Sequence, residues 1–452
     1  MNSPRQRFIQ TATGRILRLG GLLCLVLVST HCATVPTGTP VPDSRRPAVA
    51  TQYRQRLKQM RKNIPAITAG AEMVAKQWVE RRHVLLHFPF GGDGSNFAME
   101  MVSRAGGLDN AQLNTIRLHL RSSNDIFVCS ARSWEKGGDY LRKELPRCRT
   151  NGWRTVLFAS QKGLPPDLPV DILIDNGAKD GREEYGAVNQ IVNMTQGWMW
   201  CCELTAALTR LGQRPGILKG MLLPGATAHN KEYQRSNELP ELYPCDTAIP
   251  PGQLAHAYLD AVEKELAGLE GADMQAKIGQ AADLAADRVR AGGTLWAASM
   301  THVLDGEVFW DNRSPIHAFR GISCGAKGET FTRNLKSGDL LLWFGEWTVN
   351  LPWRDYLQII RSTGADYLVS FRRGPEAMEP LEGEGQERTY QPRIDEAKMI
   401  LDQPWPFEGA VVPIPFPPGK MAPVSGVHLC LLYRMLDEAI AARLPPPVPL
   451  NK

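Results

Sequence analysis

The sequence contains no apolar run near the roughly 20 residues that a membrane-spanning helix needs, which excludes a polytopic membrane protein. It has no CxxC pair and no regular cysteine spacing, so we expect no disulfide framework, no zinc knuckle and no other metal site. Seven cysteines lie beyond residue 32, an odd number at scattered positions. Two of them, Cys201 and Cys202, stand in an apolar, helix-like run, which favours buried thiols that pack as small hydrophobic groups.

Acidic residues are missing from the N-terminal segment, and their absence accounts for most of the net charge. Four arginines and no acid precede residue 32: Arg5, Arg7, Arg15 and Arg18. Without these arginines the formal charge falls from +5 to +1. A nearly neutral body lacks the basic excess typical of proteins that bind a phosphate backbone, so we expect no nucleic-acid partner.

Residues 1–32 have the order of an export signal. The arginines are followed by the apolar stretch Leu19–Val28, which is too short to span a bilayer. Residues 33–50 form a Pro/Thr-rich spacer. From this order we expect an exported protein of the periplasm or cell envelope. Cys32 stands where a lipid-modified cysteine would stand, so the protein is expected to be either lipid-anchored in the membrane or plainly secreted. A first helix buried in the core and an unprocessed cytoplasmic extension are the alternatives.

The body of the chain has the pattern of an α/β protein. With 452 residues, 43% of them hydrophobic and 22% charged, the chain suggests two or three globular domains. Short apolar runs alternate with helix-patterned segments, which predicts parallel sheets covered by helices on both faces. In the first half we expect strands at 83–88, 125–130, 155–159 and 171–175, and helices at 52–82, 97–104, 134–148 and 195–211.

The same order of elements returns after residue 250, which indicates a duplication. The expected strands are 294–299, 339–344, 366–371 and 409–413, and the expected helices are 253–269, 272–290, 352–364 and 425–443. We therefore predict two tandem three-layer αβα sandwiches, at 51–237 and 250–444, that pair within the chain. An acidic insertion at 374–392 is expected to be a surface loop, and 445–452 a tail.

Two loops carry polar residues at the ends of predicted strands. The first is the glycine loop Gly91–Ser95, whose glycines bring backbone N–H groups close to an anion at the start of a helix. It is neither a Walker loop nor a GxGxxG fingerprint, so we expect no nucleotide or other cofactor. A tight turn is the alternative. The second loop, Ser130–Ser133, offers hydroxyls and an arginine to an anionic oxygen, and a helix N-cap by Ser133 is compatible with that role.

These loops, in register, carry a resemblance to the SIS (sugar isomerase) domain family. The matching segments are LLHFPFGGDGSNFAMEMVSRAGGL at 85–108, NDIFVCSARS at 124–133, VDILIDNG at 170–177 and PGATAHNKEY at 224–233. Within that family the chain is most similar to the phosphoheptose isomerase type. A second, degenerate copy resembles the same family from about residue 253 to 444, with the glycine loop lost.

The resemblance implies a phosphosugar site. Its phosphate would be held by Gly92, Gly94, Ser95, Ser130, Ser133 and Thr195. Glu100 would act as the base of an aldose–ketose isomerisation, and His229 would open the ring or shuttle a proton. A solvated helix position for Glu100 and a structural role for His229 are the alternatives.

Two functions are compatible with these features. One is the binding of a phosphorylated or otherwise anionic sugar, with isomerase activity left open. The other is a non-catalytic exported envelope protein that senses or scaffolds cell-wall sugars. Five tryptophans of the second half could stack on sugar rings, although core packing is favoured: Trp296, Trp310, Trp343, Trp347 and Trp353.

Overall fold

The computed structural model describes the chain in twelve segments, and every structural statement here concerns these alone. They are residues 49–89, 95–113, 121–178, 188–220, 223–233, 240–300, 303, 316–318, 334–347, 360–372, 397–406 and 408–444. The predicted signal peptide, Cys32, nearly all of the spacer, the 374–392 insertion and the tail lie outside these residues.

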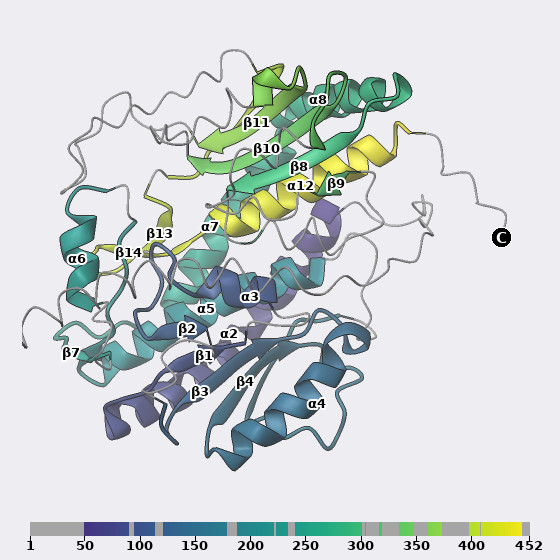
Figure 1. Cartoon of the computed structure of the whole chain (residues 1–452). Helices are drawn as coiled ribbons and strands as arrows, with labels where there is room; N and C mark the ends of the chain where they lie inside the picture. The colour runs from purple at the N-terminus through teal and green to yellow at the C-terminus, as the bar shows by residue number, and fades with distance from the viewer. Residues whose placement is uncertain are drawn as a thin grey trace, which may run out of the picture.

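The first sheet has five parallel strands. The strands are short and most of their residues are buried, which suits a sheet covered on both faces. The strands are β1 (Leu86–Phe88), β2 (Ala111–Leu113), β3 (Ile126–Ser130), β4 (Arg154–Ala159) and β5 (Ile172–Asp175). Their order across the sheet is β2-β1-β3-β4-β5, and every neighbouring pair is parallel (Figure 1).

The second sheet repeats this order. It contains β8 (Leu295–Met300), β9 (His317–Ala318), β10 (Leu340–Trp347), β11 (Asp366–Arg372) and β12 (Met399–Asp402). The order is β9-β8-β10-β11-β12, again with parallel neighbours. The strand at Leu295 therefore holds the same position as the strand at Leu86, as the internal repeat requires. A common origin of the two halves stays a prediction.

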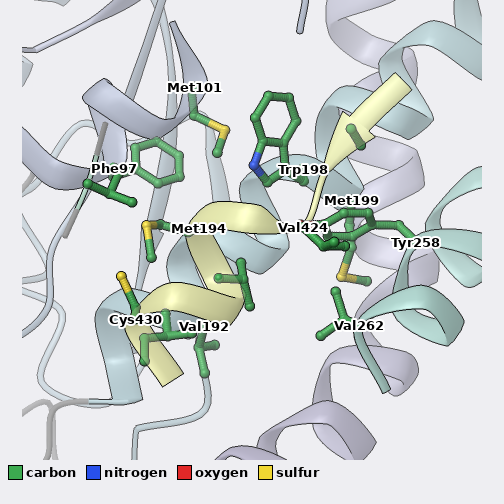
Figure 2. Packing of buried hydrophobic residues seen from close by; sticks show 14 of the residues in the cluster. Phe97, Met101, Val192, Met194, Trp198, Met199, Tyr258, Val262, Val424 and Cys430 are labelled. Carbon is green, nitrogen blue, oxygen red and sulfur yellow. The ribbon is translucent and has the colours of Figure 1, made fainter. Parts of the chain in front are cut away.

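Four long helices lie between the two sheets and contact one another. They are α2 (Val49–Arg81), α5 (Val188–Arg210), α7 (Gln253–Glu270) and α12 (Ser425–Ala441) (Figure 1). Together with inward-facing residues of both sheets they form one continuous core. Close packing within it is illustrated in Figure 2, where Trp198 and Met194 of α5 lie beside Phe97 and Met101 of α3 (Ser95–Met101).

The strands alternate their side chains between this core and an outer layer. Ile126 and Val128 of β3 face the core, whereas Phe127 and Cys129 pack with α4 (Trp134–Thr150) on the outer face. The second sheet does the same with a separate outer cluster, which includes Trp343 and, at its margin, Trp296. Core packing is therefore confirmed for these two tryptophans. Trp310 and Trp353, and the side chain of Trp347, lie outside the described residues.

Within the described residues the predicted elements largely match the observed ones, and the differences fall at helix boundaries and short strands. Residues 352–359 of the helix predicted at 352–364 lie outside the described residues. The helix expected from Thr195 begins at Val188, and α2 begins at Val49, two residues inside the predicted spacer. The strands β2, β12 and β14 (Lys420–Pro423) and the helix α6 (Ala226–Tyr233) were not predicted. Each of these four elements has eight residues or fewer, so its pattern is weak. The described cysteines form no disulfide. Within the described segments, no helix is long and apolar enough to cross a membrane.

Candidate functional site at the sheet edge

In the first sheet the chain adds β2 on one side of β1 and then β3, β4 and β5 on the other side. The strand order therefore reverses between β1 and β3, and this position favours ligand binding. In open parallel sheets, ligands bind at the carboxyl ends of the strands where the strand order reverses. The loops that follow β1 and β3 border this position. Residues 91–94 of the glycine loop, with Gly92 and Gly94, lie outside the described residues. Ser95 is half-buried and begins α3.

The loop after β3 turns its carbonyl groups toward α5. Asn193 donates its amide to the carbonyl of Ala131 at 3.0 Å, and Asn189 donates to the carbonyl of Arg132 at 2.9 Å. In a planar trans peptide the C=O of one residue and the N–H of the next point in opposite directions. The N–H groups of Arg132 and Ser133 therefore both point away from the asparagines. Two successive N–H groups with one orientation are a common anion-binding arrangement.

Two buried polar side chains near this loop have no hydrogen-bond partner among the described residues. Ser130 is 3% exposed and Gln190 is 0% exposed. The atoms without a partner among the described residues are the hydroxyl oxygen of Ser130 and both the oxygen and the nitrogen of the Gln190 side-chain amide. An unpaired buried polar group costs about 1–3 kcal/mol, so such groups commonly indicate an absent water, ion or ligand.

Both side chains lie on the same face of the sheet as α3. The alternation along β3 turns Ser130 toward the core, as it does Val128. Gln190 precedes Gly197 by seven residues, or about two turns of α5, and so shares its helix face. Gly197 packs directly against Phe97 and Met101 of α3. Gln190 thus faces the α3 side near the start of α5, where Asn189 contacts the loop.

The start of α4 adds further attraction for an anion. The Ser133 carbonyl accepts the N–H of Gly137 at 2.9 Å, so Ser133 occupies the N-cap position of this helix. A helix N-terminus carries a partial positive charge. Arg132, 4% exposed, adds a full positive charge to the same loop. The loop therefore combines N–H donors, a hydroxyl and positive charge, which suits a phosphate or another compact anion.

Thr195 is not part of this arrangement. It is fully buried on α5, where its hydroxyl donates to the carbonyl of Ile191 at 2.8 Å and lies 2.6 Å from the Tyr53 hydroxyl. Burial raises the pKa of Tyr53 above its usual value, so the phenol stays protonated. Thr195 therefore joins α5 to α2, a role that differs from the phosphate contact implied by the sequence.

Glu100 also lies in the interior. Its carboxylate is fully buried, accepts the indole N–H of Trp198 at 3.0 Å and lies 3.6 Å from the guanidinium of Arg104. A Cβ atom built on Gly426 would come within 2.3 Å of it, so the carboxylate rests against the first turn of α12. A general base has to reach its substrate, and Glu100 is enclosed by protein groups.

His229 occupies a third environment, on α6. Its Nε2 atom lies 2.8 Å from the carbonyl of Ile217, which can only accept, so Nε2 carries the proton. An open pocket of about 540 Å³ lies beside it, bounded by the turn between β13 (Ala410–Pro413) and β14. The pocket is lined by Lys219, His229, Ile414, Pro415, Phe416, Pro417, Pro418 and Gly419. None of the hydrogen bonds or ring contacts found for His229 connects it to Ser130 or Glu100.

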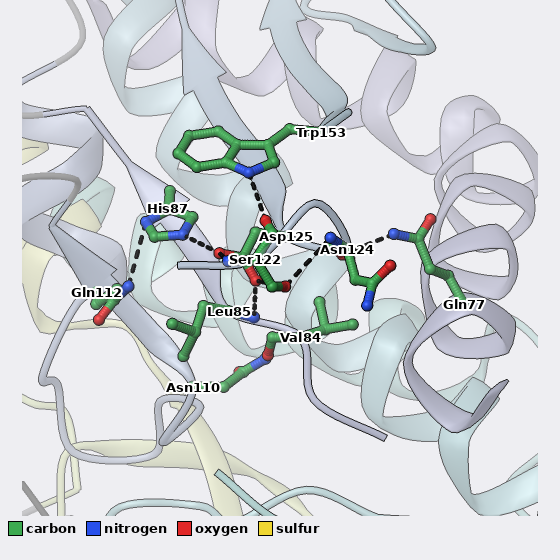
Figure 3. Close-up of polar contacts among 10 residues, drawn as sticks. All are labelled: Gln77, Val84, Leu85, His87, Asn110, Gln112, Ser122, Asn124, Asp125 and Trp153. Atoms are coloured by element: carbon green, nitrogen blue, oxygen red, sulfur yellow. Dashed lines mark hydrogen bonds and ion pairs between the residues drawn. The ribbon is translucent and has the colours of Figure 1, made fainter. Parts of the chain in front are cut away.

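A half-buried serine meets a buried aspartate and a buried histidine at the opposite end of the first sheet, near the start of β3 (Figure 3). Asp125 lies 2.7 Å from Nε2 of His87 and accepts the Ser122 hydroxyl at 3.0 Å. The aspartate stands between the other two, whereas a nucleophilic triad places the histidine between serine and aspartate. His87 is fully buried and stacks on Trp153 at 4.6 Å. This cluster therefore holds strand ends together.

Sequence reasoning missed the amides that complete the sheet-edge site. Asn189, Gln190 and Asn193 lie in the helical turns that precede the predicted start at Thr195. A usable signal was present, because three amide side chains within five residues are unusual in an otherwise apolar helix. Their spacing places Asn189 and Asn193 one turn apart on one face.

No family model matches the sequence, and no curated protein matches it. Solved structures with some similarity to this chain include the C-terminal domain of glucosamine-fructose-6-phosphate aminotransferase from Francisella tularensis. It is 10% identical, with a TM-score of 0.48, and the match covers 89% of this chain and 98% of that one. A Salmonella typhimurium LT2 protein whose description proposes sugar binding is 11% identical, with a TM-score of 0.45, and the match covers 88% of this chain and 98% of that one.

Another similar structure comes from Silicibacter pomeroyi DSS-3, and its description proposes a phosphosugar isomerase. It is 11% identical, with a TM-score of 0.39, and the match covers 86% of this chain and 97% of that one. At these scores the likenesses carry no argument about what this chain does.

Proposed function

We propose that the chain binds a small phosphorylated sugar, with the phosphate at the carboxyl edge of the first sheet. The observation that carries this proposal is the loop after β3, whose two N–H groups, at Arg132 and Ser133, point away from the asparagines that hold its carbonyls. The Ser130 hydroxyl and the Gln190 amide, which have no partner among the described residues, supply further polar contacts. The sugar part of the ligand is taken from the sequence resemblance.

Binding without isomerisation is the form of this function that the geometry favours. An aldose–ketose isomerase needs a base beside the substrate carbonyl. Glu100, the residue that the resemblance implies for that role, is paired with Trp198 and Arg104 in the interior. A non-catalytic sensor or scaffold for sugar derivatives is therefore the variant of the proposal that we prefer.

The test compares two serines at the same edge of the sheet. Ser130 has no described partner, whereas Ser160 donates to the carbonyl of Ala178 at 2.7 Å. Ser130→Ala should weaken binding of sugar phosphates about tenfold or more, since a hydrogen bond to a charged group contributes roughly 1.5–3 kcal/mol. It should leave stability unchanged or slightly raised. Ser160→Ala should lower stability by about 1 kcal/mol and leave affinity unchanged.

Titration calorimetry against a panel of sugar phosphates, with inorganic phosphate as the minimal probe, measures the affinities, and urea unfolding measures the stabilities. If the parent protein binds no member of the panel, the proposed function is wrong. If it binds and Ser130→Ala binds equally well, the ligand lies elsewhere. The pocket beside His229 would then be the next position to examine.

We also propose that the protein is exported, and that its two halves pair within one chain. Export is supported by the arginines and the apolar stretch of residues 1–32. Pairing is supported by the equal strand orders and the shared core. Sequencing the N-terminus of the protein from its native host tests export: a start at or near Cys32 is expected, and an intact Met1 in the soluble cytoplasmic fraction would contradict it.

A further inference from the structure

The asparagines that hold the sheet-edge loop are themselves held in fixed orientations. On one side, Arg56 of α2 donates to the side-chain oxygen of Asn189 at 3.2 Å. A guanidinium can only donate, so the contacted atom of Asn189 is its oxygen. The amide nitrogen of Asn189 must then face the Arg132 carbonyl, which can only accept.

A second branch reaches the loop from the residues that follow β5. The backbone N–H of Ala178 donates to the side-chain oxygen of Asn176 at 2.9 Å, which fixes the orientation of that amide. The nitrogen of Asn176 then donates to the oxygen of Asn193 at 3.1 Å. Asn193 is left with its nitrogen toward the Ala131 carbonyl at 3.0 Å. Every donor and acceptor in this branch is determined by a backbone group at each end.

Arg56 joins the two branches. Its other guanidinium nitrogen donates to the backbone carbonyl of Asn176 at 2.9 Å. Gly177 leaves room for it: this residue has a φ of +71°, and a Cβ atom there would come within 3.0 Å of the guanidinium. The three asparagines are buried, at 2%, 3% and 0% exposure for Asn176, Asn189 and Asn193. A buried amide that rotated by 180° would place two oxygens against each other in one contact and two nitrogen donors against each other in the other.

We propose that Arg56 and Asn176 are positioning residues, which act through Asn189 and Asn193 to point the N–H groups of Arg132 and Ser133 at the bound anion. This inference rests on the proposed function, since it concerns the same site. None of these four residues needs to contact the ligand. Their effect on affinity would come from the orientation of two peptide groups, each fixed by the carbonyl on its far side.

The variants separate orientation from charge. Asn176→Ala, Asn189→Ala and Asn193→Ala change no charge and each removes one link. We expect each to weaken binding of inorganic phosphate and of the best sugar phosphate by about fivefold or more. Arg56→Met should act similarly, and Arg56→Lys should recover part of the affinity because one donor is kept. If Arg56 acted only through its charge, the three asparagine variants would bind phosphate as tightly as the parent.

Asn63→Ala is the matched control. Asn63 lies on α2 like Arg56, is half-buried like it, and donates to the carbonyl of Asp175 at 2.8 Å. Its amide is oriented by Gln59 at 3.2 Å. It therefore has the same kind of relay and reaches the same sheet edge, but no contact between it and residues 130–133 is found. Its removal should cost stability without changing affinity.

A readout at the loop itself distinguishes positioning from a general loss of stability. With arginine and serine labelled with ¹⁵N, the amide signals of Arg132 and Ser133 should move downfield when the parent protein is saturated with inorganic phosphate. These shifts should shrink in the three asparagine variants and persist in Asn63→Ala.

Two outcomes distinguish failure of the relay from failure of the binding proposal. If the parent binds phosphate in a Ser130-dependent way, and the asparagine variants keep both its affinity and its amide shifts, the relay is wrong while the binding proposal stands. If the parent binds neither phosphate nor any sugar phosphate, both proposals fail together.

Discussion

The carboxylate of Glu203, in the middle of α5, accepts the backbone N–H of Gly252 at 2.8 Å, and that of Ala255 at 3.1 Å, at the start of α7. Gly252 precedes the helix and has no side chain to cap it. Glu203 is fully buried and also accepts the Thr68 hydroxyl at 2.9 Å. One carboxylate thus connects α2, α5 and α7, and its negative charge meets the positive end of a helix.

Glu203→Ala should lower the free energy of unfolding by about 3 kcal/mol, because it leaves three buried donors without an acceptor. Glu203→Gln should cost less, since one oxygen remains. Urea unfolding checks both values. Glu270→Gln is the control: Glu270 pairs with Arg54 at the surface, where such pairs contribute about 0–1 kcal/mol. Equal losses for Glu203→Ala and Glu270→Gln would show that Glu203 does not cap α7.

Gly197 sets how closely α3 approaches α5. A Cβ atom at this position would lie 2.6 Å from Phe97 and 2.9 Å from the Met101 sulfur, so one of them would have to move. Gly197→Ala should therefore destabilise the protein by about 1–3 kcal/mol despite the better helix propensity of alanine. Because the shift would displace α3, and Ser95 with it, phosphate affinity should fall as well.

Gly279 is the matched control for this substitution. It lies inside α8 (Ala272–Arg290), and the nearest atom to a Cβ placed there would be a terminal nitrogen of Arg443 at 3.5 Å. Gly279→Ala should stabilise the protein by about 0.5–1 kcal/mol, the usual difference in helix propensity. If both alanines stabilise, the α3–α5 contact is looser than described.

Glu438 of α12 should make stability depend on pH. It accepts the N–H of Val49 at 3.0 Å, and burial is the main cause that raises its pKa to about 7. The folded state therefore holds a proton that the unfolded chain releases above about pH 4.5. Its contribution to stability is complete below that pH and is lost as the pH rises through 7.

The free energy of unfolding should therefore change more steeply with pH in the parent than in the Glu438→Gln variant. Between pH 4.5 and 7.5 the free energy of unfolding of the parent should fall by about 3 kcal/mol relative to that of the variant. Urea unfolding at intervals of half a pH unit measures the difference. Glu80→Gln, at an exposed position of α2, should leave the slope of the parent unchanged. Parallel curves for parent and Glu438→Gln would contradict the raised pKa.

The sequence predicted the layers of the fold better than the site, for physical reasons that particular residues show. Runs such as 126–129 and 340–344 are apolar throughout because both faces of these strands are buried, and this pattern is local. Strand β2 has three residues, too few for any periodicity. The sheet-edge loop was found because its serines follow a predicted strand.

The roles of individual residues depend on tertiary contacts that no local pattern contains. Thr195 and Ser130 look equally suitable in sequence, but Thr195 contacts Tyr53 and Ser130 has no described partner. Asn189 contributes because Arg56, 133 residues away, orients its amide. His229 and Glu100 were grouped by a family pattern, and the environments that the structure gives them share no contact.

Glu100→Gln decides between a binding protein and an isomerase. The carboxylate and Arg104 form a buried pair, and Arg104 also donates to the Ser425 hydroxyl at 2.8 Å where α12 begins. Removing the charge leaves Arg104 buried with a weaker partner, so unfolding should become easier by about 2–4 kcal/mol. Sugar-phosphate affinity should stay within about twofold of the parent.

The double variant Glu100→Leu with Arg104→Met should lose less stability than the sum of the losses of the two single variants, because it leaves no unpaired charge. Coupled assays for aldose–ketose conversion, run beside calorimetry, complete the test. Turnover in the parent that disappears in Glu100→Gln while binding is kept would make Glu100 the base of an isomerase and overturn the structural role given to it here.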